Sequence, residues 1–493
     1  MPPARLLVAL APLLLLACNR SSSPPPPEQV ASPAPLGLAR ENLASVLLEG
    51  IPHVRQKPDF CGEACVSMAL ARLGHPLDQD EIFARTGLDP ALGRGAYTAE
   101  LKQAVEAVGF DPGRVWYRID VAKADEALGA ELAALHADLQ KGIPSIVCMH
   151  YSESPTTTEH FRLVVGYDSS RDEIIYHEPA EDAGAYRRMS RTRFLSLWPL
   201  KHSKDAWTAI RLRLAPQDLA LAKATPRKPG FSSADYAQKV MEVKEKTSRL
   251  RGEFTILVEP PFVVVGDGPV PQVRRGAEGT VRWATEKLKK DYFAKDPSRV
   301  LVVWLFKDRP SYERNAIMLF GEKPTTPYGY YSSKHSALVM NIATGGGTLV
   351  HEIVHPFVEA NFSDCPPWFN EGLGSLYEQS GEQDGRIHGY TNWRLRGLQS
   401  AIAENRVPSF RALTGMNDGA FYEGDYGVHY STSRYLLYYL QEKGLLVRYY
   451  HEFHANREKD PTGYDTLRRV LGEEDMTAFK KRWETYVLGL SFP

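Results

Sequence analysis

Leu349-Val350-His351-Glu352-Ile353-Val354-His355 is the stretch that decides how the second half of this 493-residue chain is interpreted. Gly345-Gly346-Gly347-Thr348 precedes it and offers a cap for a helix. Two histidines four residues apart project from one helix face about one turn apart, so both imidazoles can reach one metal ion. Glu352 lies beside the first histidine and can accept the proton from a water that attacks a carbonyl group.

A second helix is expected to supply a third ligand, from the run Pro366-Pro367-Trp368-Phe369-Asn370-Glu371-Gly372. The two prolines can set the start of this helix, which puts Glu371 in its first or second turn. Imidazole nitrogen and carboxylate oxygen suit zinc in a tetrahedral shell that keeps one position open. We therefore predict zinc as the cofactor, with His351, His355 and Glu371 as its ligands and Glu352 as the catalytic base.

These two helices and the helical region after them resemble the gluzincin peptidases over roughly residues 231–493. The resemblance implies zinc-dependent hydrolysis of peptide bonds by a domain with a small β-sheet and a mainly helical C-terminal lobe. Many gluzincins place a carboxylate one turn beyond the third ligand, where it orients a histidine. Ser375 occupies that position here, and Glu378 is a candidate to take over the role.

Two further features concern the geometry of this site. Pro356 follows the second histidine and should kink the helix, because proline lacks an amide hydrogen and crowds the preceding turn. Zinc peptidases usually supply a Tyr, His or Arg donor to the developing oxyanion. We choose Tyr430, with Tyr426 and His429 behind it, although a core or surface role is as frequent for any one of them.

A second constellation lies near the other end of the chain, in Gln56-Lys57-Pro58-Asp59-Phe60-Cys61-Gly62-Glu63-Ala64-Cys65. This run precedes an apolar helix, and the helix dipole favours a thiolate at such a start. His160 begins an apolar strand about a hundred residues later, and Glu178 follows in Tyr176-His177-Glu178-Pro179. Taken alone, Cys61 would be interpreted as a buried or disulfide-bonded cysteine, and only the joint spacing favours a site.

Cysteine, histidine and carboxylate in this order resemble the papain-like triad of the double-glycine, bacteriocin-processing peptidase family. By position, the resemblance implies Cys61 as nucleophile, His160 as base, Glu178 as the residue that orients the base and Gln56 as oxyanion donor. The family usually has the shorter Asp where Glu178 stands. A papain-like α+β domain over residues 41–213 is therefore expected, with His53, His150 and His177 as ordinary polar residues.

The first residues of the chain have the pattern of an export signal. Leu6 to Ala17 is apolar but too short to span a membrane, and it ends in Leu15-Leu16-Ala17-Cys18. This resembles a bacterial lipobox, which implies removal of residues 1–17, lipidation of Cys18 and a membrane anchor in the cell envelope. Asn19 is not the aspartate that retains many lipoproteins in an inner membrane, so the outer membrane is implied, with the protein facing the periplasm or the surface. The alternative is a secreted protein in which Cys18 is incidental.

The composition limits which binding partners are expected and which chemistry the cysteines can have. The 59 basic and 60 acidic residues leave no excess positive charge for nucleic acid. Outside the cytoplasm two structural disulfides would be the default for Cys61, Cys65, Cys148 and Cys365, but spacing does not assign the pairs and Cys61 has a better claim as a nucleophile. A Cys65 to Cys148 bridge is one possibility. Residues 18–40 are Pro- and Ser-rich and form a tether, while 214–230 form a linker between domains.

Hydrophobic periodicity predicts an α+β chain with few β-strands after residue 347. In the first domain we expect helices at the start given by Cys61, near 98–109 and near 122–141, and strands at 144–149, 161–167 and 173–176. In the second we expect helices at 232–250, 272–290, 390–404, 426–443 and 476–486, and strands at 254–259, 262–266, 300–306 and 336–343.

The combined hypothesis is an envelope-anchored lipoprotein with two tandem peptidase-like modules, one zinc and one thiol, acting on peptides or proteins. One alternative keeps the zinc peptidase but makes the N-terminal domain an inactive peptide-binding module. Another makes the whole chain a non-catalytic envelope assembly lipoprotein. The oligomeric state is not indicated by the sequence.

Overall fold

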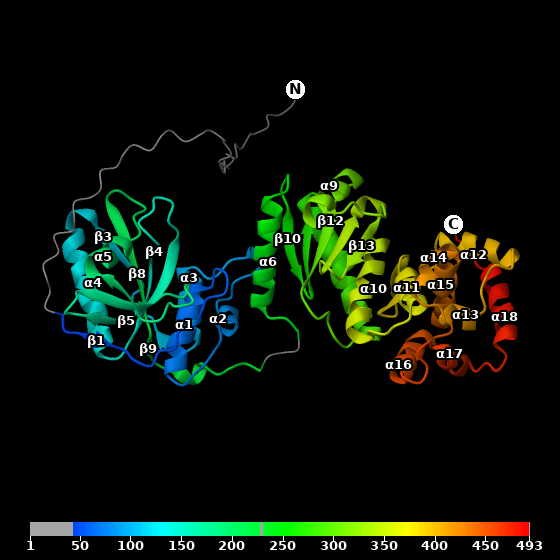
Figure 1. The fold of residues 1–493 in the computed structure, drawn as a ribbon, viewed down its shortest axis with the longest axis horizontal. Coiled ribbons are helices and arrows are strands. Elements are labelled where there is room, and N and C mark those ends of the chain that lie inside the picture. Colours follow the sequence, from blue (N-terminus) through cyan, green and yellow to red (C-terminus); the bar gives the residue numbers. More distant parts are fainter. Residues whose placement is uncertain (1–42, 227–229, 493) are drawn as a thin grey trace, which may run out of the picture.

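The computed structural model describes residues 43–226 and 230–492, which form two domains side by side (Figure 1). The predicted signal peptide, Cys18 and the tether lie outside the described residues. Within the described ranges, no helix combines the length and apolar character that crossing a bilayer requires. Both domains mix helices with a β-sheet, which confirms the predicted mixed fold class.

The N-terminal domain is built around a seven-stranded antiparallel sheet. Strands β4 and β5 at its centre are buried along nearly their whole length, because helices α1 and α4 pack against them. The strand order is β3 (Trp116–Asp120), β8 (Ala206–Arg213), β4 (Ser145–His150), β5 (Glu159–Asp168), β6 (Glu173–His177) and β7 (Arg187–Ser190), with β1 (Val46–Leu47) also on β5. The helices are α1 (Cys61–Arg72), α2 (Gln79–Arg85), α3 (Thr98–Ala107), α4 (Ala124–Gln140) and α5 (Arg191–Leu197).

This domain extends past its predicted end at residue 213. Strand β9 (Ala215–Pro216) pairs with β2 (Phe110–Asp111), and Ala222 is buried in the same hydrophobic core. The first part of the predicted linker 214–230 is therefore folded onto the domain. The sequence prediction was wrong here because a two-residue strand leaves no periodicity to detect.

The second domain contains a five-stranded mixed sheet whose order is β10-β11-β12-β14-β13. The central β11-β12-β14 pairs are parallel, and the two outer pairs are antiparallel. The strands are β10 (Thr255–Glu259), β11 (Phe262–Gly266), β12 (Leu301–Phe306), β13 (Gly329–Ser332) and β14 (Ala337–Asn341). Strand β13, at the edge of the sheet, was not predicted.

Side-chain alternation along β12 explains how this sheet holds helices on both faces. Val303 and Leu305 belong to one core together with Ile353 and Phe357 of helix α10 (Gly347–Asn361). The residues between them, such as Trp304, belong to a second core with helices α6 (Ser233–Ser248) and α9 (Arg309–Phe320). Every residue of β12 is buried as a result.

Helices dominate the chain after β14, as expected, and pack beyond α10 in the second domain (Figure 1). The hairpin of β15 (Ser380–Gln383) and β16 (Arg386–Gly389) was not predicted, because its residues are polar and show no apolar alternation. The remaining helices are α7 (Val270–Gly276), α8 (Trp283–Asp291), α11 (Pro367–Leu376), α12 (Arg394–Ala403), α13 (Phe410–Thr414), α14 (Asp418–Glu423), α15 (Tyr426–Glu442), α16 (Leu446–Asn456), α17 (Tyr464–Leu471) and α18 (Met476–Leu488).

Helix α6 joins the two domains through a small apolar cluster of its own. Ala234 and Ala237 of α6 are fully buried against Phe60 and Phe83 of the N-terminal domain, whose rings stack with centroids 4.9 Å apart. Gln238 on the same helix donates a 3.0 Å hydrogen bond to the carbonyl oxygen of Pro58. The second domain therefore packs against the turn that immediately precedes Cys61.

Candidate active sites

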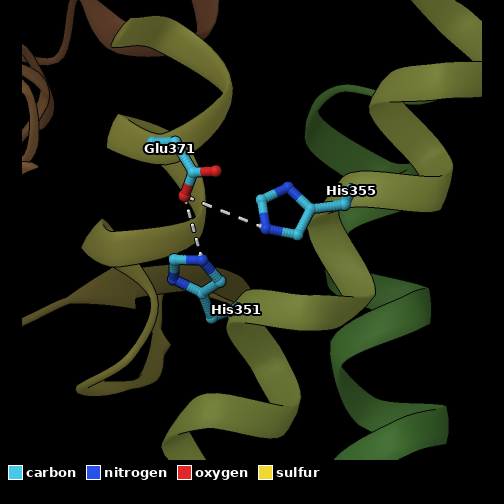
Figure 2. A group of neighbouring side chains, drawn as sticks. All are labelled: His351, His355 and Glu371. Atoms are coloured by element: carbon cyan, nitrogen blue, oxygen red, sulfur yellow. Dashed lines mark ion pairs between the residues drawn. The ribbon is translucent and has the colours of Figure 1, made fainter. Parts of the chain in front are cut away.

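Helices α10 and α11 bring the three predicted zinc ligands together (Figure 2). The ligand atoms of His351, His355 and Glu371 all lie within 4.8 Å of one another. Oε2 of Glu371 is 3.2 Å from Nε2 of His351 and 4.0 Å from Nε2 of His355. Helix α11 begins at Pro367, which places Glu371 in its second turn, and α10 continues through Pro356 to Asn361.

The arrangement of Glu371 fits a metal ion. Its Oε1 accepts a 2.7 Å hydrogen bond from the hydroxyl of Tyr422, whereas its buried Oε2 accepts none from any described residue. A buried carboxylate charge has to be compensated by a cation, either a protonated histidine or a metal ion held between the carboxylate and the two imidazoles. Two imidazole nitrogens and one carboxylate oxygen that converge in this way are the donor set that suits zinc.

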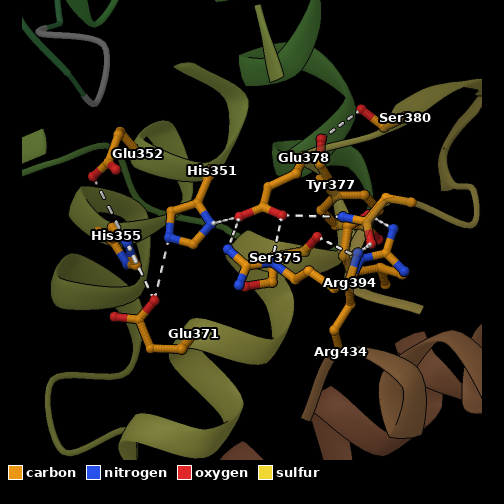
Figure 3. A network of polar contacts seen from close by, with 12 residues as sticks. His351, Glu352, His355, Glu371, Ser375, Tyr377, Glu378, Ser380, Arg394 and Arg434 are labelled. Atoms are coloured by element: carbon orange, nitrogen blue, oxygen red, sulfur yellow. Dashed lines mark hydrogen bonds and ion pairs between the residues drawn. The ribbon is translucent and has the colours of Figure 1, made fainter. Parts of the chain in front are cut away.

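Both histidines are oriented through the ring nitrogen that points away from Glu371 (Figure 3). Nδ1 of His355 is 3.0 Å from Oδ1 of Asn370, and Nδ1 of His351 is 3.3 Å from Oε1 of Glu378. Such partners select the tautomer that leaves Nε2 available to a metal. Glu378 therefore contacts His351 in the way expected of the carboxylate that Ser375 replaces. The buried hydroxyl of Ser375 has no hydrogen-bond partner among the described residues.

Glu378 is itself held in place by a buried polar network. Arg394 donates two hydrogen bonds to it, of 2.8 Å to Oε2 and 2.7 Å to Oε1, and the amide of Asn392 donates one of 3.1 Å. Burial alone would raise the pKa of Glu378, but its contacts with Arg394 and His351 hold that pKa at about 2. Glu378 is therefore an anion, as an orienting group for a metal-bound histidine should be. Sequence reasoning could not identify Arg394 and Asn392, which lie outside the two motifs.

Glu352 lies beside the ligands in the position of a base. Its Oε2 accepts a 2.9 Å hydrogen bond from the backbone N–H of Tyr331, on the edge strand β13, and lies 3.9 Å from Nε2 of His355. Burial raises the pKa of Glu352. A carboxylate with a raised pKa and one fixed oxygen is suited to take up and return a proton.

The three residues considered as oxyanion donors differ in their surroundings. Tyr430 lines the cleft, and the guanidinium of Arg394 lies 5.2 Å from its ring centroid. Tyr426 is 64% exposed at the cleft rim. His429 is buried with Nδ1 2.9 Å from the carbonyl oxygen of Phe421, so it is engaged by the protein backbone. Tyr422, which sequence reasoning missed, also faces the cleft, through its bond to Glu371.

A cleft of about 2040 Å³ opens over these residues. Its walls come from β13, α10, the start of α11, the β15 strand and the segment around Tyr426. Aromatic side chains line much of it, namely Trp283, Tyr328, Tyr330, Tyr331, Phe362, Trp393, Tyr422, Tyr426 and Tyr430. A space of this size accommodates several residues of a polypeptide.

In the N-terminal domain, the predicted base and its orienting residue lie in contact. Nε2 of His160, on β5, is 2.5 Å from Oε1 of Glu178, which follows β6, and both side chains are buried. Cys61 is the first residue of α1 and lies against the backbone of Phe161, the residue after His160. Strand β5 therefore brings the imidazole and the start of the cysteine helix to one place.

The thiol of Cys61 differs from the expected thiolate. Burial raises its pKa to about 12, the negative charges of Glu63 and Asp59 act in the same direction, and the backbone of Phe161 and Gly62 only partly offsets them. The helix dipole is therefore outweighed by desolvation. The disulfide expectation was also wrong, because Cys61, Cys65, Cys148 and Cys365 are all free thiols.

Arg162 is a member of this site that sequence reasoning missed. Its Nε donates a 2.6 Å hydrogen bond to Oε2 of Glu178, the oxygen that does not contact His160. Burial raises the pKa of Glu178, but His160 and Arg162 outweigh it and hold the pKa at about 2. Residues two apart on a strand share a face, so the position of Arg162 relative to His160 was an available signal.

Gln56 and His53 lie beside the turn that carries Glu178. The backbone N–H of Gln56 donates a 2.9 Å hydrogen bond to the carbonyl oxygen of Pro179, and Nε2 of His53 is 2.9 Å from the carbonyl oxygen of Glu178. The side-chain oxygen of Gln56 is buried and has no hydrogen-bond partner among the described residues. Its role as an oxyanion donor stays a prediction.

The comparisons with known proteins concern this N-terminal domain. Residues 48–206 match the Peptidase_C39 like family. This match supports the predicted resemblance of the N-terminal domain to a cysteine-type peptidase family. The peptidase domain of Streptococcus ComA, a bi-functional ABC transporter involved in a quorum sensing pathway, is 18% identical with a TM-score of 0.23, and the match covers 34% of this chain and 100% of that domain. No curated protein matches the chain.

Proposed function

We propose that this chain is an envelope-anchored peptidase with two tandem modules, a zinc peptidase in its second domain and a thiol peptidase-like module in its first. The observation that carries the proposal is the convergence of His351, His355 and Glu371, with Oε2 of Glu371 buried and without a donor. The gluzincin-like order of these residues supports the same assignment.

His351, His355 and Glu371 would hold the zinc ion. When bound, zinc supplies Lewis-acid polarisation of the scissile carbonyl and of the attacking water. Glu352 takes the proton from that water and returns it to the leaving amine, while the N–H of Tyr331 keeps its carboxylate in place. Asn370 and Glu378 hold the two imidazoles in orientation. Tyr430 is our choice as hydrogen-bond donor to the developing oxyanion.

In the thiol module, His160 removes the proton from Cys61 as the thiol attacks a carbonyl, and Glu178 stabilises the imidazolium that forms. Because burial raises the pKa of Cys61, the free protein holds it mainly as the neutral thiol, and His160 takes up the proton during the attack. The same observation supports the alternative in which the first domain binds peptides without cleaving them, since an unactivated thiol is a weak nucleophile.

Peptide-library cleavage tests both modules in one experiment. Wild type, Glu352→Gln and Cys61→Ala are compared, with zinc content measured by elemental mass spectrometry. We expect about one zinc per chain in all three. Products lost only in Glu352→Gln belong to the zinc module, and products lost only in Cys61→Ala belong to the thiol module. A zinc-free wild type, or a zinc-loaded one that cleaves nothing, contradicts the proposal and favours an assembly role.

The envelope location rests on the lipobox-like Leu15-Leu16-Ala17-Cys18. Metabolic labelling with a radioactive fatty acid in a bacterial host tests it, with Cys18→Ser as the control. We expect label and membrane fractionation for wild type and neither for the variant. Unlabelled wild type in the culture medium indicates an ordinary secreted protein.

A further inference from the structure

The cleft over the metal ligands carries more negative than positive side chains. Arg394 is the only lysine or arginine among the described residues that line it. The acidic residues that line it are Glu352, Glu359, Glu371, Glu378 and Glu382. Which substrate side chains the cleft favours depends on which of these carboxylates already has a positively charged partner in the protein.

Four of the five carboxylates are committed to partners. Glu371 faces the two histidines, and Glu352 is held by the backbone of Tyr331. Glu378 accepts two hydrogen bonds from Arg394. Arg394 is the only guanidinium among the described residues that line the cleft, so that group is already paired. Glu382 forms a 2.9 Å ion pair with Lys287, which lies outside the cleft lining.

Glu359 is the fifth carboxylate, and no cation of the described residues pairs with it. It is exposed, and its Oε2 accepts a 2.7 Å hydrogen bond from the hydroxyl of Tyr331. That bond fixes the carboxylate while leaving its charge uncompensated. Tyr331 thus contacts two glutamates, Glu352 through its backbone and Glu359 through its side chain.

The position of Glu359 relates it to the scissile bond. It lies one helical turn after His355 on the same face of α10, about 6 Å further along the helix axis at about 1.5 Å per residue. An extended peptide covers that length with about two residues. A substrate group that pairs with Glu359 is therefore within about two residues of the bond at the metal ligands.

We propose that Glu359 binds a cationic group of the substrate, within about two residues of the bond that is cleaved. The group is an ammonium or guanidinium, from a Lys or Arg side chain or from a free amino terminus. The part of the cleft lined by described residues offers no unpaired lysine or arginine to recognise a terminal carboxylate, so carboxypeptidase action is disfavoured. This inference rests on the proposed zinc peptidase function.

Matched peptides test the inference by kinetics. The set has Lys, Arg, norleucine or Glu at each of the two positions on either side of the cleaved bond, with acetylated or free amino termini and amidated or free carboxyl termini. We expect wild type to favour the cationic over the norleucine peptides by about two- to fivefold in kcat/KM, the usual effect of one exposed ion pair. Amidation of the carboxyl terminus should have little effect.

Variants assign the preference to one carboxylate. Glu359→Gln should reduce the ratio of cationic to norleucine substrates to near one, and Glu359→Lys should shift the preference toward the Glu peptides. Glu382→Gln is the matched control, because Glu382 lines the same cleft but is neutralised by Lys287. Cleavage of acetylated Lys and Arg peptides identifies a side chain as the cation, whereas dependence on a free amino terminus identifies the terminal amine.

A binding measurement separates this inference from the proposed function. Fluorescence anisotropy of labelled Lys and norleucine peptides is followed with zinc-loaded Glu352→Gln and with the same protein carrying Glu359→Gln. A Lys preference that disappears with Glu359→Gln supports the inference even when wild type cleaves nothing. Cleavage without a cationic preference, or a preference that Glu359→Gln leaves intact, overturns the inference while the peptidase function stands. Absence of both cleavage and preferential binding overturns both.

Discussion

Oε1 of Glu378 lies 3.3 Å from Nδ1 of His351, on the side of the imidazole opposite the one that faces Glu371 (Figure 3). Glu378 follows the last residue of α11 by two positions, whereas the position one turn after Glu371 is Ser375. The end of the helix thus allows a later residue to turn back toward the histidine. The bonds from Arg394 hold this arrangement in place.

Replacement of Glu378 by Gln is expected to weaken zinc binding by about 10- to 100-fold, the usual effect of losing an orienting carboxylate. Competition with a zinc chelator measures the affinity. Ser375→Ala is the matched control, because its hydroxyl makes no hydrogen bond to a described residue and its loss should leave the affinity unchanged. Equal affinities for wild type and Glu378→Gln would show that His351 is oriented by another group.

Removal of the metal should destabilise the second domain. Glu371 and His351 are buried, and without a metal ion only the two imidazoles face the Oε2 of Glu371. We expect chelation to lower Tm and added zinc to restore it, with a shift that grows with zinc concentration as mass action requires. Differential scanning calorimetry measures this. A Tm that does not change when zinc is removed or added would contradict the ligand assignment.

Glu371→Gln should bind zinc less tightly and lose the response of Tm to zinc, because an amide cannot supply an anionic ligand. Tyr422→Phe is the informative comparison, since it removes the hydrogen bond to the other oxygen of Glu371 and keeps the ring. We expect Tyr422→Phe to retain the metal with a smaller loss in affinity. Zinc titrations of the two purified variants measure which of them binds zinc more tightly.

Alkylation of Cys61 should depend on pH as a neutral, half-buried thiol does. Because burial raises its pKa to about 12, the thiolate fraction is small at pH 7 and rises about tenfold per pH unit from there toward pH 11. Mass spectrometry of the Cys61 peptide after timed treatment with iodoacetamide gives the rates. A rate that is already level near pH 7 would mean that His160 holds Cys61 as a thiolate in the free protein.

The contact between the domains predicts that Ala237→Arg disturbs the N-terminal domain. Ala237 is fully buried against Phe60, the residue before Cys61, and an arginine there overpacks the cluster and buries a charge. We expect a loss of stability of about 1–3 kcal/mol or more, and a changed alkylation rate at Cys61. Lys246→Ala, on the exposed side of α6, is the control. Unchanged stability and reactivity would show that the two domains are independent.

Much of the fold could be predicted because its elements carry local signals. Long apolar runs such as Phe161–Tyr167 predict central strands, and the spacing of His351 and His355 predicts a helix with one metal-facing side. Short polar elements escaped prediction, among them β13 and the β15-β16 hairpin. Both belong to hairpins between strands that are neighbours in sequence, but strands of four residues show too little apolar alternation to be distinguished from a loop.

The sequence by itself determined the residue types of both candidate sites and the helices and strands that carry them. The spacing of the histidines and the Pro366-Pro367 start of α11 are local features of the sequence. The order of Cys61, His160 and Glu178 can likewise be seen in the sequence alone. Only the tertiary structure decided the partners that tune them, namely Tyr331, Arg394 and Arg162, and the burial that raises the pKa of the Cys61 thiol. The physical reason is that hydrogen-bond partners and burial depend on which distant segments meet, whereas backbone periodicity depends on neighbours in sequence.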